Sequence, residues 1–417
     1  MSRALTGWFL LLLGATRAGA TDLPALLDEA LRNSPVLAAA GARAEAASHR
    51  PAQAGTGPDP IAKIGLINES LTHLTLGESP DSVLEFRWMQ EVPYPGKLDL
   101  SAAAARADLE VARTQAGILR WELGSAVKQA WTELVRLEHT AEILDGSRDL
   151  LASFQQSARA RYESGEGMLE SVLKAQTELA RLEGERLTLM QRQRDVELEL
   201  MALLGRETPP VLVEHKNWPE VTGGQDVEDL VAWATEHAPR MQEINRMQEA
   251  ALARADLARR NLKADFSWEA AYGNRGGLDP MFTAMAGFRL PIRKSRLQTE
   301  AVTQADFELE AALRERDGRR VEQVRAIRSA WSRQQRASDL AELTREAILP
   351  QARAAMEAAS AAYRAGKVDF LTLLDSFLAK LRYEIDLETQ TAERIIAFAQ
   401  MEPLTARELV IPGGTHE

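Results

Sequence analysis

The chain has 417 residues, of which 61 are acidic and 50 basic, and its formal net charge is −11. This acidic balance argues against a nucleic-acid partner. The sequence contains no cysteine, which excludes disulfides, thiolate metal sites and an amino-terminal lipidated cysteine. We therefore predict that the protein is not a lipoprotein.

Residues 1–20 have the pattern of a secretory signal peptide. Arg3 supplies the positive start, residues 8–13 are apolar, and Ala18-Gly19-Ala20 is a small-residue cleavage site. We expect the mature chain to begin near Thr21. No later segment has the ~18 to 20 apolar residues that a membrane helix needs. If the mature chain enters a bilayer, the sequence predicts that it does so as a β-barrel.

The mature sequence contains two copies of one pattern, which predicts an internal duplication. The first matched residues are Asp22, Leu26, Ala30 and Pro35, which recur at constant spacing as Asp226, Leu230, Ala234 and Pro239. Each set describes a capped helix that stops before a proline. The predicted organisation is a first repeat over residues 21–205, a linker over 206–225, a second repeat over 226–402 and a tail over 403–417.

Each repeat continues with two segments in which apolar and polar residues alternate. They predict strand pairs at about residues 59–93 and 264–291, with loops at 69–82 and 273–280. In the segment 83–92, one face carries Leu84, Phe86, Trp88 and Val92, and the other carries Glu85, Arg87 and Glu91. An aromatic face opposite a charged face is typical of transmembrane barrel strands. Amphipathic hairpins lying on a helical core are the alternative.

Two long helical patterns follow each strand pair. In residues 98–160 apolar positions recur at steps of three and four, over a length of roughly 90 Å. A return helix extends to about residue 203, and the second repeat gives helices at 295–362 and 370–401. Many positions in the stripe are alanine, so neighbouring helices can approach closely. This favours a curved wall of helices over the alternative, a solid antiparallel coiled-coil bundle.

A short turn joins the two long helices of each repeat, at about residues 162–170 and 363–375. In each turn a tyrosine ends the helix and a glycine follows three residues later, Gly165 in the first and Gly366 in the second. Glycine supplies the positive φ that ends a helix. Each turn therefore reads as the tip of a helical hairpin.

The sequence gives little support for catalysis or metal binding. Its six histidines show no ligand spacing. Met281 and Met285 share a predicted strand face and could offer thioether sulfur to copper or silver, although gap filling is the better explanation. The sequence contains no nucleophile elbow, phosphate loop or acid–base pair in a supporting context. We predict no enzymatic activity, no cofactor and no metal site.

The chain resembles the TolC family of outer-membrane efflux channels in the order of its features. These features are the two repeats, the Tyr-x-x-Gly tips and residues 91–97 (Glu-Val-Pro-Tyr-Pro-Gly-Lys). The resemblance covers essentially the whole mature chain. It implies a mainly α fold with membrane β structure. Each subunit of a homotrimer would give four strands to a twelve-stranded β-barrel, continued by an α-barrel of long antiparallel helical hairpins. The implied location is the outer membrane of a Gram-negative bacterium, with the helices in the periplasm.

The function implied by the resemblance is a passive exit duct in a tripartite efflux system. Its partners would be a periplasmic adaptor protein, an inner-membrane efflux pump and outer-membrane lipid. Residues 91–97 and the short chain look most like the branch that works with cation-exporting resistance-nodulation-division pumps, so heavy-metal cations or small toxic compounds would be the substrates. A type I protein secretion channel and a periplasmic adaptor or coiled-coil scaffold are the alternatives.

The resemblance also suggests site residues at the tips. Asp375 matches a family position in the entrance constriction, and Glu170 lies at the corresponding place in the first tip. In a trimer each would form a ring of three carboxylates that attracts cations; a solvated helix face is the alternative. Tyr162 and Tyr363 could hydrogen-bond across hairpins to hold the entrance closed, or could simply pack at a helix end. The expected adaptor-docking residues are Gly165, Gly167, Met168, Leu169, Gly366, Val368 and Phe370.

Four basic residues follow the predicted strands, at the expected inner surface of the membrane. They are Lys97, Arg293, Lys294 and Arg296. They could contact lipid phosphates, and solvated helix starts are the alternative.

Overall fold

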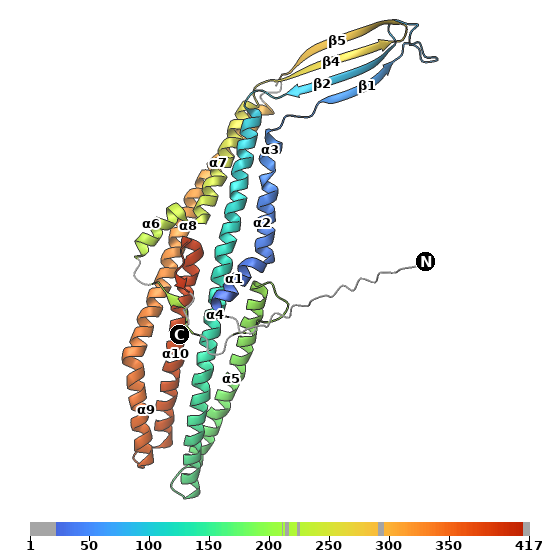
Figure 1. Ribbon diagram of the computed structural model, residues 1–417. Helices are drawn as coiled ribbons and strands as arrows, with labels where there is room; N and C mark the ends of the chain where they lie inside the picture. The colour runs from blue at the N-terminus through green and yellow to red at the C-terminus, as the bar shows by residue number, and fades with distance from the viewer. Residues whose placement is uncertain (1–21, 211, 213–216, 223–225, 291–295, 412–417) are drawn as a thin grey trace, which may run out of the picture.

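The computed structural model describes residues 22–210, 212, 217–222, 226–290 and 296–411. The molecule is elongated, with a β-sheet at one end and two helical hairpin tips at the other (Figure 1). The predicted signal peptide at residues 1–20 lies outside the described residues. None of the described helices has the length and hydropathy needed to cross a membrane.

Short helices open each half of the chain. The first half has α1 (Leu23–Asn33), α2 (Pro35–Ser48) and α3 (Arg50–Gly55), and the second has α6 (Val227–His237) and α7 (Pro239–Arg260). Ser34 separates α1 from α2, and its side chain accepts a hydrogen bond from the Leu37 N–H at 3.4 Å. The predicted helix end before each proline is confirmed, because Pro35 and Pro239 begin the next helix.

Four long helical segments form the body of the molecule. They are α4 (Lys97–Glu163), α5 (Leu169–Leu203), α8 (Gln298–Leu343) continuing into α9 (Leu349–Arg364), and α10 (Phe370–Thr405). The 67 residues of α4 span about 100 Å. The prediction of one regular helix between the second strand pair and the second tip is wrong in detail. A π-helical turn, η1 (Thr344–Ile348), separates α8 from α9, next to Pro350, which has no N–H to donate.

The helices lie side by side, as the alanine-rich stripe predicts. α4 packs against α5 on one side and α10 on another, and α10 packs against α8 and α9 (Figure 1). Apolar side chains from α4, α5 and α10 form one continuous buried cluster, with Leu151 and Phe377 fully buried within it. Large apolar side chains such as Leu187 on α5 and Phe307 on α8 are exposed. The outer helices of the wall therefore carry apolar groups that the single chain leaves uncovered.

The sheet contains β1 (Ile61–Ile67), β2 (Val83–Val92), β4 (Asp265–Arg275) and β5 (Leu278–Arg289), so the strand predictions are confirmed. The strand order is β1-β2-β4-β5 and every pair is antiparallel. The two halves of the chain therefore meet between β2 and β4. The sheet extends beyond the helical body (Figure 1), which contradicts the alternative of hairpins lying on a helical core.

Register separates the residues of the sheet into two faces, because directly paired residues share a face. Ile64, Phe86, Tyr272 and Phe282 are paired in one row, and Trp88, Ala270 and Ala284 lie in another. These side chains form an apolar face on which Phe282 is 72% exposed. Lys63, Glu85, Arg87 and Glu269 lie on the opposite, polar face. The predicted aromatic and charged faces are confirmed.

The second hairpin turn is shorter than the predicted loop at 273–280. β4 continues to Arg275 and β5 begins at Leu278, so the turn is formed by Gly276 (φ +69°) and Gly277. Pro280 is tolerated because β5 lies at the sheet edge. Gly273 marks a close strand contact and not a loop, since a Cβ there would lie 2.5 Å from Cγ2 of Val83.

The linker and the tail pair with each other beside the helical body. β3 (Glu220–Val221) and β6 (Val410–Ile411) form a small antiparallel sheet. The tail predicted from residue 403 is partly helical, because α10 continues through Pro403 to Thr405. Pro403 has no N–H for the carbonyl of Ala399, and the hydroxyl of Ser125 donates to that carbonyl instead, at 2.7 Å.

Candidate functional site

The two hairpin tips have the same backbone structure. At the first, the Gly165 N–H donates to Tyr162 and the Glu166 N–H donates to Arg161. At the second, the equivalent donors are Gly366 and Lys367, and the acceptors are Tyr363 and Ala362. Both glycines are left-handed, with φ of +80° and +68°. This is the Schellman arrangement, in which one left-handed residue lets two N–H groups satisfy the last carbonyls of a helix.

The left-handed glycine of the second tip gives a testable prediction. Replacing Gly366 by Ala is expected to lower the free energy of unfolding by about 1 kcal/mol, because an L side chain is strained at positive φ. Gly184 in α5 is the matched control. It lies within a helix with nothing within 4 Å of an added Cβ, so alanine there should stabilise by roughly 0.5–1 kcal/mol. Denaturant unfolding of both variants checks the opposite signs, and equal signs would contradict this account of the tip.

Contacts around Tyr363 join the two tips within one chain. Its side chain is 6% exposed and packs edge-on against Phe370, with ring centroids 5.8 Å apart. The Arg161 guanidinium of the first hairpin lies 4.4 Å from the centre of the Tyr363 ring and donates to the Arg364 carbonyl at 2.9 Å. Burial raises the pKa of Tyr363, and the Arg161 charge opposes that shift. The tips are therefore held together by a cation over a buried ring.

The other predicted gate residues point into solvent in the single chain. Asp375, Glu170 and Tyr162 are exposed. Within the described residues, Asp375 forms no ion pair, and neither tip tyrosine hydroxyl donates to the other hairpin. Asp369 instead caps α10, accepting from the Thr372 N–H at 2.9 Å and from its hydroxyl at 2.6 Å. The Thr372 hydrogen bonds lower the pKa of Asp369.

The predicted docking residues divide into exposed and covered groups. Met168 is 73% exposed and Leu169 is also exposed, beside the exposed Gly165 and Gly366. Gly167 and Val368 are half-buried. Phe370, also expected to dock the adaptor, does not offer its ring to a partner in the single chain, because the residue is only 2% exposed and belongs to the apolar cluster under the tips. An apolar residue at the first position of a helix can face inward as easily as outward, so the turn alone does not decide its exposure.

Several charges on the polar face of the sheet form ion pairs. Arg87 binds Glu85 and Glu269, which lie on two neighbouring strands. Nearer the helices, Arg289 of β5 binds Glu91 of β2. Met281 and Met285 lie on this face and are about half exposed, four positions apart on one strand. Among the described residues, no three His, Cys, Asp or Glu side chains gather as a metal-binding group.

Lys97 does not face lipid. The possibility that it contacts lipid phosphates is therefore wrong for this residue. Its ammonium lies 2.7 Å from the Asp265 carboxylate and donates to the Lys263 carbonyl at 3.0 Å, and the residue is buried. Asp265 also accepts from the Tyr94 N–H at 2.8 Å. Lys97 therefore fixes the junction of sheet and helices. Arg293 and Lys294 lie outside the described residues, and Arg296 is exposed.

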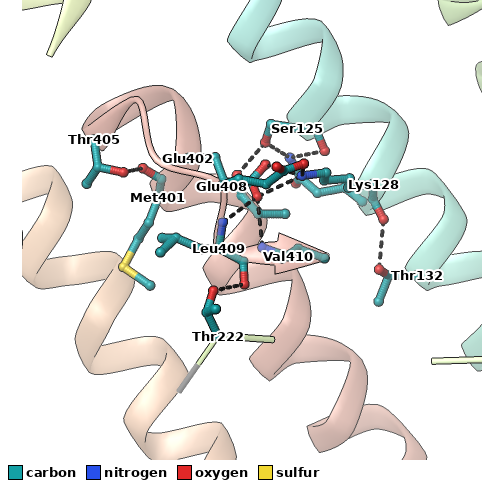
Figure 2. Close-up of polar contacts among 12 residues, drawn as sticks. Ser125, Lys128, Thr132, Thr222, Met401, Glu402, Thr405, Glu408, Leu409 and Val410 are labelled. Atoms are coloured by element: carbon teal, nitrogen blue, oxygen red, sulfur yellow. Dashed lines mark hydrogen bonds and ion pairs between the residues drawn. The ribbon is translucent and has the colours of Figure 1, made fainter. Parts of the chain in front are cut away.

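A buried ion pair that the sequence did not indicate joins the two halves of the chain (Figure 2). The Lys128 ammonium of α4 lies 2.8 and 3.0 Å from the two Glu402 carboxylate oxygens of α10, and the side chains are 3% and 1% exposed. Glu402 also accepts from the N–H groups of Leu409 and Val410, both at 2.8 Å. Burial raises the pKa of Glu402, and Lys128 and the two N–H groups oppose the shift. The pair thus anchors the carboxyl-terminal tail.

No known family model and no curated protein matches the chain. Solved structures do match it over nearly its whole length. The outer membrane protein VceC of Vibrio cholerae is 20% identical, with 92% of this chain and 96% of that chain covered and a TM-score of 0.78. The chain has a TolC-like outer-membrane channel fold.

Two further structures have the same fold. CusC, described for its conformational changes on transmembrane channel formation, is 14% identical, with 92% of both chains covered and a TM-score of 0.78. The CmeC outer membrane channel of Campylobacter jejuni is 13% identical, with 94% and 87% covered and a TM-score of 0.76. At these identities the likeness establishes architecture, and the predicted fold class is confirmed.

Proposed function

We propose that this protein is the outer-membrane exit duct of a tripartite efflux system and that it acts as a passive homotrimeric channel. The observation that carries the proposal is the division of the molecule into two unlike ends. One end is a sheet with an exposed apolar face and a charged polar face. The other end is a pair of tips, which about 100 Å of helix separates from the sheet. Such a shape suits a duct that crosses a membrane and continues beyond it.

The edges of the sheet support the proposed trimer. β1 and β5 are its outer strands, and each has one edge without a partner strand in the described chain. In a threefold arrangement, β5 of one subunit would pair with β1 of the next and close a twelve-stranded barrel. The strands β2, β4 and β5 have 10, 11 and 12 residues, which is the length that a tilted strand needs to cross a bilayer. Outer-membrane lipid would then cover the apolar face.

The same symmetry accounts for the uncovered helices. Exposed apolar side chains on α5 and α8, including Leu187 and Phe307, would be covered by helices of neighbouring subunits, and the three walls would form an α-barrel in the periplasm. The exposed tip residues Met168 and Leu169 would then face a periplasmic adaptor protein, and an inner-membrane pump would deliver the substrate. The chain itself would supply no energy.

Cations are the substrate class that the tips favour. Asp375 is exposed and has no counterion among the described residues, so three copies around one axis would concentrate negative charge at the entrance. Glu170 would add a second acidic layer. We therefore propose that the pump partner exports heavy-metal cations or small cationic toxic compounds.

Reconstitution in planar bilayers tests the proposal. The purified protein is expected to open discrete ion-conducting steps that are blocked by multivalent cations added on the side of the tips. A protein that inserts but conducts anions in preference would contradict the cation assignment alone. A protein that never inserts into the bilayer would contradict the proposal that it is a channel.

A further inference from the structure

The junction between sheet and helices carries an arginine with no counterion. Arg260 ends α7 directly below the sheet and is exposed. Among the described residues, no carboxylate pairs with its guanidinium, whereas its neighbour Arg259 binds both Asp256 and Asp306. Lys263, three residues further on, is also exposed and has no ion-pair partner in the described chain. Two unneutralised positive charges thus lie at this level of the molecule.

The position of Arg260 is fixed by its surroundings. Its guanidinium lies 6.0 Å from the centre of the Tyr94 ring. It also lies beside Gly96, where an added Cβ would be 3.5 Å from the guanidinium. The φ of Gly96 is +88°, a backbone conformation that favours glycine. Tyr94 is held in turn by its N–H bond to Asp265. The guanidinium is therefore positioned in advance, with its N–H donors available to an external acceptor.

A row of aromatic rings leads from this guanidinium across neighbouring strands, at the end of the sheet nearest the helices. The Tyr94 ring stacks on Phe266, with centroids 6.3 Å apart and 20° between the planes, and Phe266 packs edge-on against Phe288 at 5.4 Å. Phe288 is 61% exposed, and Leu290, two residues nearer the helices, is also exposed. A cation beside an exposed apolar surface matches a ligand with an anionic head and a hydrocarbon chain.

We propose that Arg260, Tyr94, Phe266 and Phe288 form a binding site for an anionic phospholipid of the leaflet nearest the helices. The phosphate would accept a bidentate pair of hydrogen bonds from Arg260, and Lys263 would add a second charge. One acyl chain would pack against the exposed Phe288 ring. The site rests on the proposed membrane insertion of the sheet. It would fix the depth of the sheet in the bilayer and couple the barrel to α7.

The test compares phosphatidylglycerol with phosphatidylcholine on the purified full-length protein in detergent. We expect phosphatidylglycerol to raise the melting temperature by several degrees more than phosphatidylcholine, and native mass spectrometry to retain it preferentially. Arg260→Gln should weaken phosphatidylglycerol binding about tenfold, because charge-assisted bidentate bonds are lost. Arg246→Gln is the matched control, since Arg246 is exposed on the same helix and binds Glu249 instead; it should leave the preference unchanged. Inorganic phosphate alone should produce no shift.

Further variants and outcomes distinguish failure of the lipid site from failure of the channel proposal. Arg260→Lys keeps the positive charge but loses the bidentate guanidinium, so it should keep part of the preference for phosphatidylglycerol. Tyr94→Leu leaves the charge in place and should weaken the retention of phosphatidylglycerol. Equal binding of both lipids by the wild type, equal phosphatidylglycerol affinity in Arg260→Gln, or an equal shift with inorganic phosphate would overturn the site while leaving the channel proposal intact. Fractionation of the wild type as a soluble protein would overturn both.

Discussion

Replacing Lys128 by Met is expected to lower the free energy of unfolding by about 3–5 kcal/mol, because it leaves the Glu402 carboxylate buried without its cation. The loss should also loosen the carboxyl-terminal tail, since the Lys128 ammonium also lies 3.5 Å from the Glu408 carboxylate of that tail. Guanidinium unfolding followed by circular dichroism measures the first effect. Hydrogen exchange at the Leu409 and Val410 amides measures the second.

The pH dependence of this variant follows from the direction of the Glu402 pKa. Burial raises that pKa in the folded protein, so protonation favours the folded state as the pH falls toward the ordinary glutamate range. Without Lys128 the opposing charge is gone and the shift should grow. The variant should therefore be most destabilised near about pH 8 and recover part of the loss near about pH 5.

The double variant Lys128→Met with Glu402→Gln is the matched control. It removes both charges and keeps a carbonyl oxygen for the two tail N–H groups, so it should recover most of the lost stability. If the double variant is as unstable as Lys128→Met alone, the loss comes from packing around the lysine stem and not from an unpaired charge.

Replacing Asp375 by Asn is expected to weaken block by multivalent cations roughly tenfold, because three carboxylates at the proposed entrance become neutral while side-chain volume is kept. Asp375→Ala should in addition raise the leak conductance. Single-channel recording in planar bilayers measures both. Since Asp375 has no ion-pair partner among the described residues, neither substitution should unfold the tip.

Glu357→Gln is the control for the Asp375 variants. Glu357 is exposed on α9, forms no ion pair in the described chain, and lies as many residues before Gly366 as Asp375 lies after it. It therefore lies on the other helix of the same hairpin, within about two turns of the same tip. Block that weakens equally in Glu357→Gln would assign the effect to general surface charge and remove the special role of Asp375.

The parts of the fold that depend on local sequence can be predicted. Helix termination is local, so Tyr162 with Gly165 and Tyr363 with Gly366 mark both tips. Strand alternation is also local, so the register of β2 follows from which residues are apolar. Turn residues are less reliable. Gly273 and Pro280 resemble loop signals, but their roles are set by a neighbouring strand and by the sheet edge.

Contacts between distant segments could not be predicted in this way. Lys128 and Glu402 are separated by 274 positions, and Arg161 reaches a tip 203 positions away. Nothing in the spacing around Lys128 distinguishes it from a solvated lysine on a helix. Pro403 is a local signal that a distant segment contacts this helix. It has no N–H for the carbonyl one turn earlier, so that carbonyl needs another donor, which is the Ser125 hydroxyl.

Outer-membrane fractionation followed by electrophoresis with and without heating tests whether this protein is a trimeric outer-membrane channel. We expect the protein to need detergent for extraction from the outer membrane and to migrate as a trimer until it is boiled. Closure of β1 against β5 between subunits is the reason for both properties. A soluble periplasmic monomer, with the apolar face of the sheet covered by something other than lipid, would contradict it.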